Sequence, residues 1–457
     1  MVVTRGAHRD PVGFADQGTV LLGRSAPDPG VRGSAGVGGK SPDEYDRPAM
    51  TADEPLDPTL AAEIAELTAG CAEVLPADGL ATRLAEARAA GRPLRVKLGI
   101  DPSGTDLTLG HAVVLRKLRQ FQDLGHTAVL IIGDFTGRVG DPTGRNETRR
   151  VLTAEQTADH SATYLEQAVQ ILRPDRLEVR RNSEWLGSMD FSEMLGYTSM
   201  LTVARLLERD DFAKRYSEGR PISLMEFMYP LMQGLDSVFV HSDVEIGGTD
   251  QTYNNLVGRT LQAQLDQPAQ VVVTVPLLRG TDGGDKMGKS LGNFIAIREA
   301  PSEQYGKVLS ISDDLVMHYA ELCCAWTRAE LAACEAELAA DPFSAKRRVA
   351  ARIVALYHGA GAAGDAAEHF DRRFRRRELV TDDLPSHALP ADGAVAVVDL
   401  LTATGLATSK SDARRVLASG GVRLDGVKLD PSVTESRVDS LRGKVLQRGK
   451  RHAVRLV

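Results

Sequence analysis

The stretch LRVKLGIDPSGTDLTLGHAVV, residues 94–114, decides the fold. Its apolar run from Leu94 to Ile100 predicts a β-strand, and the segment that opens at Leu107 predicts a helix with Gly110 and His111 in its first turn. The first turn of a helix presents free backbone N–H groups and the positive end of the helix dipole. The junction of this strand and this helix therefore predicts a binding site for an anion such as a phosphate.

A second glycine-containing motif follows about 175 residues later and reads Lys286-Met287-Gly288-Lys289-Ser290. Its two lysines would bring mobile positive charge to the same phosphates. The strings at residues 283–290 and 359–364 match GxxxxGKS and GxGxxG, but neither directly follows a predicted strand, as a P-loop or a dinucleotide-binding fingerprint does. The binding of phosphate therefore falls to the two motifs above.

Apolar runs alternate with amphipathic stretches between residues 92 and 275. Strands are predicted for residues 94–100, 127–133, 177–181 and 269–275, and helices for the segments that begin near Gly110, Thr153 and Asp250. Such alternation is typical of the α/β class. We expect a Rossmann-like parallel sheet over residues 50–300, covered by helices, with ligands beyond the carboxyl ends of the strands.

The next part of the chain is predicted to be helical. Residues 301–386 form an α-helical domain in this interpretation, with helices at 329–340 and 345–357. The domain contains the basic run 372–377, which is either a solvated charged face or a surface for an RNA backbone. Residues 387–393 lie in a stretch rich in Pro, Ala and Asp and are predicted to be a linker.

Residues 394–457 predict a small α+β unit with helices near 397–401 and 409–419. The alternating residues 422–429 around Asp425-Gly426 are a strong signal for a β-hairpin. The formal net charge of the chain is −7, yet residues 409–457 carry twelve Lys or Arg and five Asp or Glu, about +7. A basic unit on an acidic body indicates a nucleic-acid partner, although a solvated charged face would look the same in sequence.

The N-terminal segment has a different composition. Residues 1–49 contain nine Gly and five Pro without apolar periodicity, which predicts a disordered extension. Asp57-Pro58 then predicts the start of a helix whose apolar face carries Leu60, Ile64 and Leu67. We hypothesise that Met50 is the natural start of the protein and that the segment before it is dispensable.

Composition places the 457 residues, 42% hydrophobic and 26% charged, among globular proteins of two or three domains. Four cysteines are too few for a disulfide scaffold, and Cys323-Cys324 lacks the spacing of a zinc site, so we expect buried thiols and no protein-bound metal. No apolar run is long enough to span a membrane, and residues 1–30 do not resemble a signal peptide. The expected compartment is the cytoplasm.

The two phosphate motifs together resemble the signature motifs of class I aminoacyl-tRNA synthetases. The segment Tyr229-Pro230-Leu231-Met232-Gln233-Gly234-Leu235-Asp236 narrows the resemblance to tyrosyl-tRNA synthetases of the bacterial type. The run from Ser409 to Leu429 resembles the S4 RNA-binding domain that ends such enzymes. The resemblance implies a tyrosine–tRNA ligase that uses L-tyrosine, ATP and tRNA(Tyr), acts as a homodimer, and binds the anticodon with residues 301–386.

Tyr229, Gln233 and Asp236 are spaced by four and three residues and would share one face of a helix. An ordinary amphipathic helix is the alternative explanation of this spacing. The resemblance implies that Tyr229 and Gln233 bind the ammonium group of tyrosine and that Asp236 accepts a hydrogen bond from its phenol. A buried acceptor left unpaired by phenylalanine would carry a desolvation cost, which gives the physical basis of selection.

The resemblance also assigns roles to residues outside this helix. Asp141 would contact the ammonium group, and Gln251 would orient the carboxyl side of tyrosine. Gly247-Gly248-Thr249-Asp250-Gln251 resembles the family's GGSDQ and would hold the ribose, although a turn capped by Asp250 explains it equally well in isolation. The full ATP-binding set is predicted as Gly99, Asp101, Gly110, His111, Gly248, Asp250, Lys286, Met287, Lys289 and Ser290.

Catalysis is expected to rest on positioning and on charge stabilisation, because the attacking carboxylate is already an anion. The predicted donors are Ser103, Thr108, His111, Arg145, Arg149, Lys286 and Lys289, with Mg²⁺ accompanying ATP. The predicted RNA-binding residues are Lys410, Arg414, Arg415, Arg423 and Lys428.

Two residues depart from the family pattern. Thr108 stands where the family has the first histidine of its HIGH motif, and Lys97, included in the substrate-binding set, stands where many members have a tyrosine that touches the phenol. These departures keep open a synthetase paralogue with altered amino acid specificity. A second alternative, which uses the basic C-terminal unit alone, is a non-catalytic, synthetase-derived RNA-binding protein.

Overall fold

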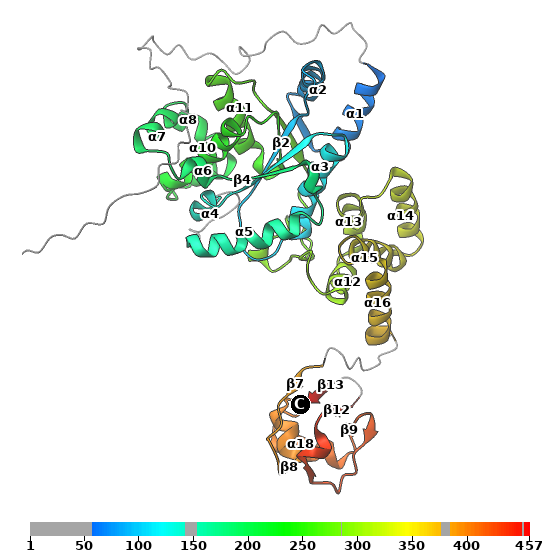
Figure 1. Ribbon diagram of the computed structural model, residues 1–457. Coiled ribbons are helices and arrows are strands. Elements are labelled where there is room, and N and C mark those ends of the chain that lie inside the picture. The colour runs from blue at the N-terminus through cyan, green and yellow to red at the C-terminus, as the bar shows by residue number, and fades with distance from the viewer. Residues whose placement is uncertain (1–56, 142–152, 285, 376–383, 450–451) are drawn as a thin grey trace, which may run out of the picture. The chain divides into compact units, whose positions relative to one another are not determined.

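The computed structural model describes residues 57–141, 153–284, 286–375, 384–449 and 452–457 (Figure 1). The predicted extension of residues 1–49 and the hypothesised start at Met50 lie outside the described residues. Within the described part of the chain, no helix is long and apolar enough to cross a membrane.

Helix α1 (Pro58–Thr68) is the first described element. The carboxylate of Asp57 accepts a hydrogen bond from the amide of Thr59 at 3.0 Å and so caps the helix. Leu60 and Leu67 are buried against the core and Ile64 is partly buried. The predicted cap and apolar face are therefore confirmed.

Six strands form the main sheet in the order β1-β6-β5-β2-β3-β4. Their bounds are β1 (Glu73–Leu75), β2 (Arg95–Ile100), β3 (Thr127–Ile132), β4 (Leu177–Arg181), β5 (Val244–Gly248) and β6 (Val271–Val275). All neighbours pair in parallel except β1, which runs antiparallel to β6. The predicted α/β class with a parallel sheet is confirmed, and β1 and β5 are strands that the sequence did not reveal.

Both faces of this sheet are covered, as the continuous apolar sequence of β3 requires. Ala128, Leu130 and Ile132 of β3 face one apolar core, and Val129 and Ile131 face another. Helix α3 (Leu109–Asp123) packs on the first side. Helices α10 (Leu224–Phe239) and α11 (Thr252–Gln264) supply much of the core on the second side.

Further helices connect the strands. They are α2 (Gly79–Ala89), α4 (Thr136–Val139), α5 (Ala154–Ala168), α6 (Ser183–Leu186), α7 (Phe191–Thr198), α8 (Val203–Leu206) and α9 (Asp210–Ser217). Helix α5 begins at the predicted position, with Thr153 as its N-cap. Four of these helices lie consecutively between β4 and α10, so the chain makes a long helical excursion before β5.

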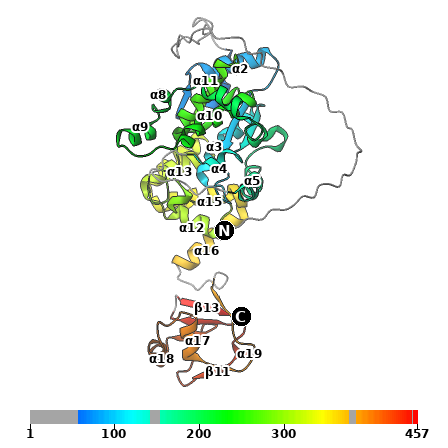
Figure 2. The same cartoon turned by 90° about the vertical axis from the view of Figure 1, so that its left-hand side faces the viewer.

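A helical region follows the sheet. It consists of α12 (Pro301–Leu309), α13 (Val316–Cys323), α14 (Arg328–Ala340), α15 (Pro342–His358) and α16 (Ala360–Phe370) (Figure 2). Helix α15 packs against α12, α14 and α16. Cys323, Cys324 and Cys334 are buried in the core that α3 also joins, whereas Cys71 is only partly buried. The expectation of buried thiols is therefore correct for three of the four cysteines.

The C-terminal unit has its own apolar core and a five-stranded sheet in the order β10-β9-β12-β13-β7. Its elements are β7 (Ser386–His387), β8 (Ala394–Ala396), α17 (Val397–Ala403), α18 (Lys410–Ala418), β9 (Val422–Leu424), β10 (Val427–Lys428), β11 (Glu435–Arg437), α19 (Val438–Leu441), β12 (Val445–Arg448) and β13 (His452–Leu456). The predicted hairpin is confirmed, with φ of 48° at Asp425 and 80° at Gly426 in its turn.

One boundary needs correction. The linker was predicted over residues 387–393, but His387 lies in β7 and pairs with Leu456 of β13. This pairing joins residues far apart in the sequence. A composition rich in Pro and Ala could not reveal it, because a two-residue edge strand depends on its partner rather than on its own propensity.

Candidate active site

Acidic side chains follow three neighbouring parallel strands at the end where ligands are expected. Asp101 comes directly after β2, Asp134 follows β3, and Asp250 follows β5. The carboxyl ends of parallel strands meet at the same edge of a sheet. The topology therefore brings Asp101 and Asp250, both predicted to bind ATP, to one edge of the sheet.

Asp101 ties this edge to helix α10. Its carboxylate accepts hydrogen bonds from the Tyr229 phenol at 2.9 Å and from the Thr136 hydroxyl at 2.7 Å. A Cβ atom at Gly133 would lie 2.0 Å from the Asp101 carboxylate, so glycine is needed there. Burial raises the pKa of Tyr229 well above its ordinary value, and the negative charge of Asp101 adds to this. The phenol therefore stays protonated and acts as a donor.

Asp236 lies on the same helix and is buried, with 3% of its surface exposed. Its carboxylate accepts hydrogen bonds from the Trp185 indole N–H at 3.0 Å and from the Asn182 amide at 3.4 Å. Burial raises the pKa of Asp236 from its ordinary value to about 7, and the nearby charge of Lys97 opposes that rise. The group is a buried acceptor whose charge changes near neutral pH.

Lys97 is fully buried and its ammonium group is engaged by the protein itself. It donates to the backbone carbonyl of Gln233 at 2.9 Å, to the hydroxyl of Ser237 at 2.8 Å and to the carboxylate of Glu245 at 2.9 Å. An ammonium group has three N–H donors. Lys97 therefore joins β2 to β5 and to α10, beneath the turn that carries Gln233 and Asp236.

A chain of amides connects the other residues predicted to bind tyrosine. Gln251 donates to the Asp141 carboxylate at 2.7 Å, and the Asn254 amide donates to both Gln233 and Gln251 at 3.2 Å. Arg209 lies 3.5 Å from Asp141 and balances its charge. The structure thus brings Asp141, Gln233 and Gln251 together, although they come from three separate segments.

The first signature motif is organised around the N-terminus of α3. Thr108 is the N-cap residue; its backbone N–H donates to His111 Nδ1 at 3.1 Å, and its hydroxyl lies 2.8 Å from the same atom. Because Nδ1 accepts from an amide, the neutral ring carries its proton on Nε2. Burial lowers the pKa of His111 to about 3, with Lys289 and Lys286 adding to the effect. His111 is therefore a neutral donor.

Each lysine of the second motif contacts a side chain from another segment, and the partner of Lys286 is a residue predicted to bind the nucleotide. The Lys286 ammonium forms an ion pair with Asp250 at 2.8 Å. Lys289 donates to the phenol oxygen of Tyr164 at 2.5 Å, and a Cβ atom at Gly104 would lie 3.1 Å from its ammonium nitrogen. The loop that carries the lysines is thereby folded onto the segment that precedes α3.

The remaining predicted nucleotide residues are backbone positions. A Cβ atom at Gly248 would lie 2.7 Å from the Leu277 side chain, so this turn needs glycine, whereas Gly99 and Gly110 have room for one. The Ser103 amide donates to the Asp101 carbonyl at 2.7 Å, and Ser290 is exposed in a turn next to Lys289. Arg145 and Arg149 lie outside the described residues.

The predicted RNA-binding residues all belong to α18 and the hairpin of the C-terminal unit. Lys410, Arg414, Arg415 and Lys428 are exposed, and Arg423 is partly buried. Lys410 pairs with Asp399 at 2.7 Å, Arg415 with Asp412 at 2.6 Å, and Arg423 donates to the Gly426 carbonyl at 2.9 Å. The Lys410–Asp399 pair is exposed on both sides and therefore weak, and the Arg415 side chain is 78% exposed although its partner Asp412 is buried, so both cations remain accessible to an anionic partner.

Several residues of the site were missed by the sequence analysis. Trp185 and Asn182 contact Asp236, Asn254 links the amides, and Tyr164 contacts Lys289. These residues form no motif, because they lie on three different segments, and only Asn182 and Trp185 share one. One weak signal existed, since Asn182 directly follows the predicted strand 177–181, where ligand-binding residues are expected.

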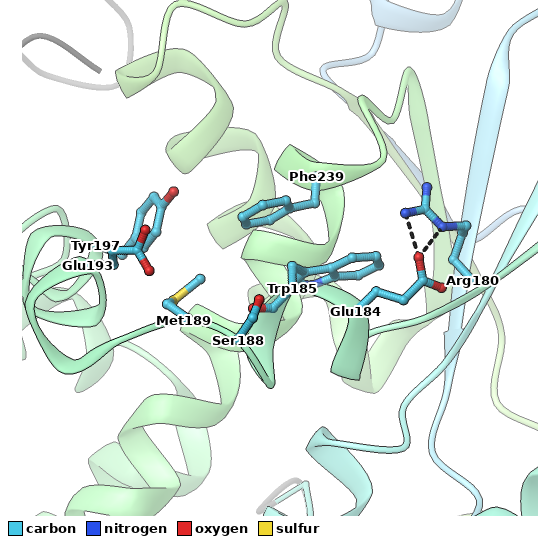
Figure 3. A pocket seen from close by; sticks show the side chains of 8 residues that line it. All are labelled: Arg180, Glu184, Trp185, Ser188, Met189, Glu193, Tyr197 and Phe239. Carbon is cyan, nitrogen blue, oxygen red and sulfur yellow. Dashed lines mark hydrogen bonds and ion pairs between the residues drawn. The ribbon is translucent and has the colours of Figure 1, made fainter. Parts of the chain in front are cut away.

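A cavity of about 310 Å³ lies beside Trp185 (Figure 3). It is lined by Arg180, Glu184, Trp185, Ser188, Met189, Glu193, Tyr197 and Phe239. The Trp185 ring stacks on Phe239, with ring centroids 5.6 Å apart and planes inclined by 6°. This stacking fixes the indole in the orientation from which it donates to Asp236.

Comparison with known proteins is consistent at every level. Residues 89–375 match the family model of class I tRNA synthetases (W and Y), and residues 377–455 match the SYY-like C-terminal domain of tyrosine–tRNA ligases. The tyrosine–tRNA ligase of Moorella thermoacetica is 48% identical over 404 residues, which cover 88% of this chain and 97% of that protein. The enzyme of Salinibacter ruber is 47% identical over 87% of this chain and 97% of its own.

Solved structures share the fold of the first part of the chain. The mitochondrial tyrosyl-tRNA synthetase of Aspergillus nidulans, truncated at its C-terminus, has a TM-score of 0.57 at 23% identity and covers 69% of this chain and 94% of its own. The enzyme of Archaeoglobus fulgidus, solved in complex with L-tyrosine, has a TM-score of 0.55 at 20% identity, with 67% and 99% covered. At these identities the likeness concerns the fold alone.

Proposed function

The chain belongs to the class I tRNA synthetases of the tyrosine–tRNA ligase family, and we propose that its cleft activates L-tyrosine with ATP and transfers the product to tRNA(Tyr). The observation that carries this proposal is the buried Asp236 carboxylate, which shares helix α10 with Tyr229 and Gln233. A buried acceptor with fixed neighbours suits the phenol of tyrosine and penalises phenylalanine. Family membership alone does not assign these roles to individual residues.

In the proposed tyrosine complex, Asp236 accepts the phenol O–H. Tyr229, Asp141 and Gln233 bind the ammonium group, and Gln251 orients the carboxylate. The amide chain through Asn254 supports this assignment, because it links three of these residues before tyrosine arrives. Lys97 contributes from below the pocket, where its charge opposes the rise in the pKa of Asp236.

The proposed first step joins a tyrosine carboxylate oxygen to the α-phosphorus of ATP and breaks the bond to the bridging oxygen of pyrophosphate. The nucleophile is an anion and needs no general base, so positioning and charge stabilisation carry the step. His111 donates from Nε2, and Lys286 and Lys289 supply positive charge. The further proposed donors are Ser103, Thr108, Arg145 and Arg149.

ATP is laid along the edge of the sheet in this proposal. Asp250 and Gly248 hold the ribose, and Asp101, Gly99, Gly110, Met287 and Ser290 complete the site. Mg²⁺ is proposed to arrive with ATP, where it neutralises phosphate charge. The described residues include no cluster of His, Cys, Asp or Glu suited to a resident metal.

In the second proposed step, the terminal adenosine hydroxyl of tRNA(Tyr) takes the tyrosyl group from the adenylate. Residues 301–386 are proposed to bind the anticodon, and residues 394–457 to bind the RNA through Lys410, Arg414, Arg415, Arg423 and Lys428. The exposure of four of these five cations supports the assignment. We propose the cytoplasm as the compartment, because all four cysteines are free thiols.

The direct test of this function is tyrosine-dependent exchange between ATP and pyrophosphate, run in parallel with tyrosine, phenylalanine and tryptophan. We expect exchange with tyrosine alone, followed by charging of tRNA(Tyr). A paralogue with altered specificity would prefer another amino acid. A non-catalytic RNA-binding protein would show no exchange with any of the three.

We further propose a homodimer that uses the helical excursion between β4 and α10. Large apolar side chains are exposed on α7 to α10, namely Phe191, Leu195, Val203, Tyr216, Leu224 and Met225. Leu224 is 81% exposed at the first position of α10. These are six of the fourteen large apolar side chains exposed among the described residues, and a concentration of exposed apolar residues in one stretch of chain is typical of an interface between subunits.

Leu224→Arg is expected to shift the protein from dimer to monomer, because it places a charge in the proposed apolar interface. Light scattering after gel filtration measures the mass. Val427→Arg is the matched control: Val427 is 72% exposed on the C-terminal hairpin, and its variant should keep the mass of a dimer. A dimeric Leu224→Arg variant would place the interface elsewhere.

A further inference from the structure

One face of helix α5 supports the segment between β2 and α3. His160, Tyr164 and Gln167 are spaced by four and three residues and lie on the same side of the helix. His160 Nδ1 lies 3.1 Å from the carbonyl oxygen of Pro102. Gln167 accepts a hydrogen bond from the Leu107 amide at 2.8 Å, so the face spans most of that segment.

Tyr164 is the middle residue of this face and lies between the two signature motifs. It is buried, with 1% of its surface exposed. Its ring meets the His111 ring edge-on, with centroids 6.2 Å apart. The Lys289 ammonium lies 4.8 Å from the centroid of the same ring and donates to its hydroxyl at 2.5 Å. One side chain therefore contacts a residue of each motif.

A lysine on a loop needs such a partner to stay at one place. Its four-carbon stem is flexible, and its ordering carries an entropic cost that a fixed partner reduces. Tyr164 offers a hydroxyl acceptor on a rigid aromatic ring, and the Lys289 ammonium lies at the hydroxyl end of that ring, 2.5 Å from the oxygen. Because Tyr164 is buried on a helix, its side chain is rigid. The loop that carries Lys289 therefore need not be rigid for the ammonium to be held in place.

We propose that Tyr164 is a positioning residue for catalysis, which holds the Lys289 ammonium beside His111 where the phosphates of ATP bind. This inference rests on the role proposed above for Lys289. Tyr164 itself makes no contact with the substrate in that proposal. By holding the ammonium in place, Tyr164 reduces the number of conformations that the Lys289 side chain must give up when the transition state forms. Its effect is therefore expected in the rate of adenylate formation rather than in the affinity for tyrosine.

The test compares Tyr164→Phe with Tyr164→Leu in single-turnover formation of the adenylate. Tyr164→Phe removes only the hydroxyl and is expected to lower the rate about tenfold, because a hydrogen bond from a charged group is lost. Tyr164→Leu also removes the ring that meets His111 edge-on and is expected to lower the rate further. The KM for tyrosine should stay unchanged in both variants, which a general disturbance of the cleft would not allow.

A double-mutant cycle separates positioning from packing. In a Lys289→Ala background, Tyr164→Phe is expected to change the rate by less than about twofold, because its partner is gone. An equal loss in both backgrounds would assign Tyr164 a purely structural role and overturn the proposal. So would a Tyr164→Phe variant whose rate matches that of the unmodified protein.

The matched control is Tyr253→Phe. It removes a phenol hydroxyl that donates to the Arg205 carbonyl at 2.6 Å, away from Lys289. Its rate should equal that of the unmodified protein, and thermal unfolding of all variants checks the fold. The outcome also separates the two proposals: no exchange in the unmodified protein refutes the proposed function, whereas an unaffected Tyr164→Phe variant refutes only the role of Tyr164.

Discussion

Asp236→Asn is expected to lower kcat/KM for tyrosine in pyrophosphate exchange by about 100-fold, because a charged acceptor for the phenol is lost. Asparagine has nearly the same shape, so the pocket keeps its volume. Its amide would present a donor to groups that already donate, namely Trp185, Asn182 and the phenol of the substrate. The loss should therefore exceed that of a simple deletion of one hydrogen bond.

The comparison with phenylalanine makes this result specific. Phenylalanine has no hydroxyl to donate, so Asp236→Asn should affect its slow activation much less than that of tyrosine. The ratio of kcat/KM for tyrosine to kcat/KM for phenylalanine should then fall by nearly the same factor as kcat/KM for tyrosine itself. Asp175→Asn, at an exposed carboxylate paired with Arg173, serves as a control and should leave both values unchanged. Equal losses for the two amino acids would contradict the role of Asp236 as the phenol acceptor.

The same carboxyl group gives the enzyme a predicted pH dependence. Because the pKa of Asp236 is raised to about 7 in the ligand-free protein, the acceptor form increases as the pH rises through 7. We expect kcat/KM for tyrosine to rise between about pH 6 and pH 8 and then to level off. Asp236→Asn should lose this part of the profile. A flat profile in the unmodified protein would mean that Asp236 is already ionised at pH 6.

The stability of the protein should respond in the opposite direction. A carboxyl group whose pKa is higher in the folded than in the unfolded state stabilises the fold at low pH and loses that contribution as the pH rises through the folded pKa. For Asp236 the window extends from about 4 to about 7. The midpoint of thermal unfolding of the unmodified protein should therefore fall as the pH rises through about 7, and Asp236→Asn should remove this part of the pH dependence. The buried carboxyl group of Asp236 thus lowers the stability of the fold above pH 7, where it also provides the charged acceptor proposed to select tyrosine.

Lys286→Ala and Lys289→Ala are each expected to lower the rate of adenylate formation about 100-fold, because each removes a positive charge from the phosphates in the transition state. Neither lysine contacts the residues proposed to bind tyrosine. The KM for tyrosine should therefore remain unchanged, while kcat falls. Rapid quenching of a single turnover measures the step directly.

The present partners of the two lysines differ, and this gives the two variants different signatures. Lys286 is paired with Asp250, the proposed ribose acceptor, at 2.8 Å, so ATP must separate them. In Lys286→Ala, Asp250 is available to the ribose without the separation of an ion pair. The KM for ATP should therefore rise by a smaller factor than the factor by which kcat falls. The control is Lys307→Ala, which removes a lysine of α12 that is paired with Glu299. Unchanged rates in the Lys286 and Lys289 variants would refute their proposed role.

Local pattern was enough to predict most of the elements that position the site. The strands β2, β3 and β6 are apolar runs with clear ends, and α10 shows its active face through the spacing of Tyr229, Gln233 and Asp236. Strand β5 was not predicted, because Glu245 interrupts a run of only five residues and its charge is typical of a surface position. In the structure it is buried and paired with Lys97, which a charge pattern cannot show.

Local sequence pattern was enough to give the α/β class, the two motifs proposed to bind the phosphates, and the face of α10 that carries the proposed tyrosine-binding residues, because periodicity and capping act within one segment. Tertiary structure alone decided the surroundings of these groups. Trp185 beside Asp236, Glu245 beside Lys97 and Tyr164 beside Lys289 are contacts between segments distant in the chain. Burial and pairing, which set the charge of Asp236 and the place of Lys289, exist only once those segments pack together.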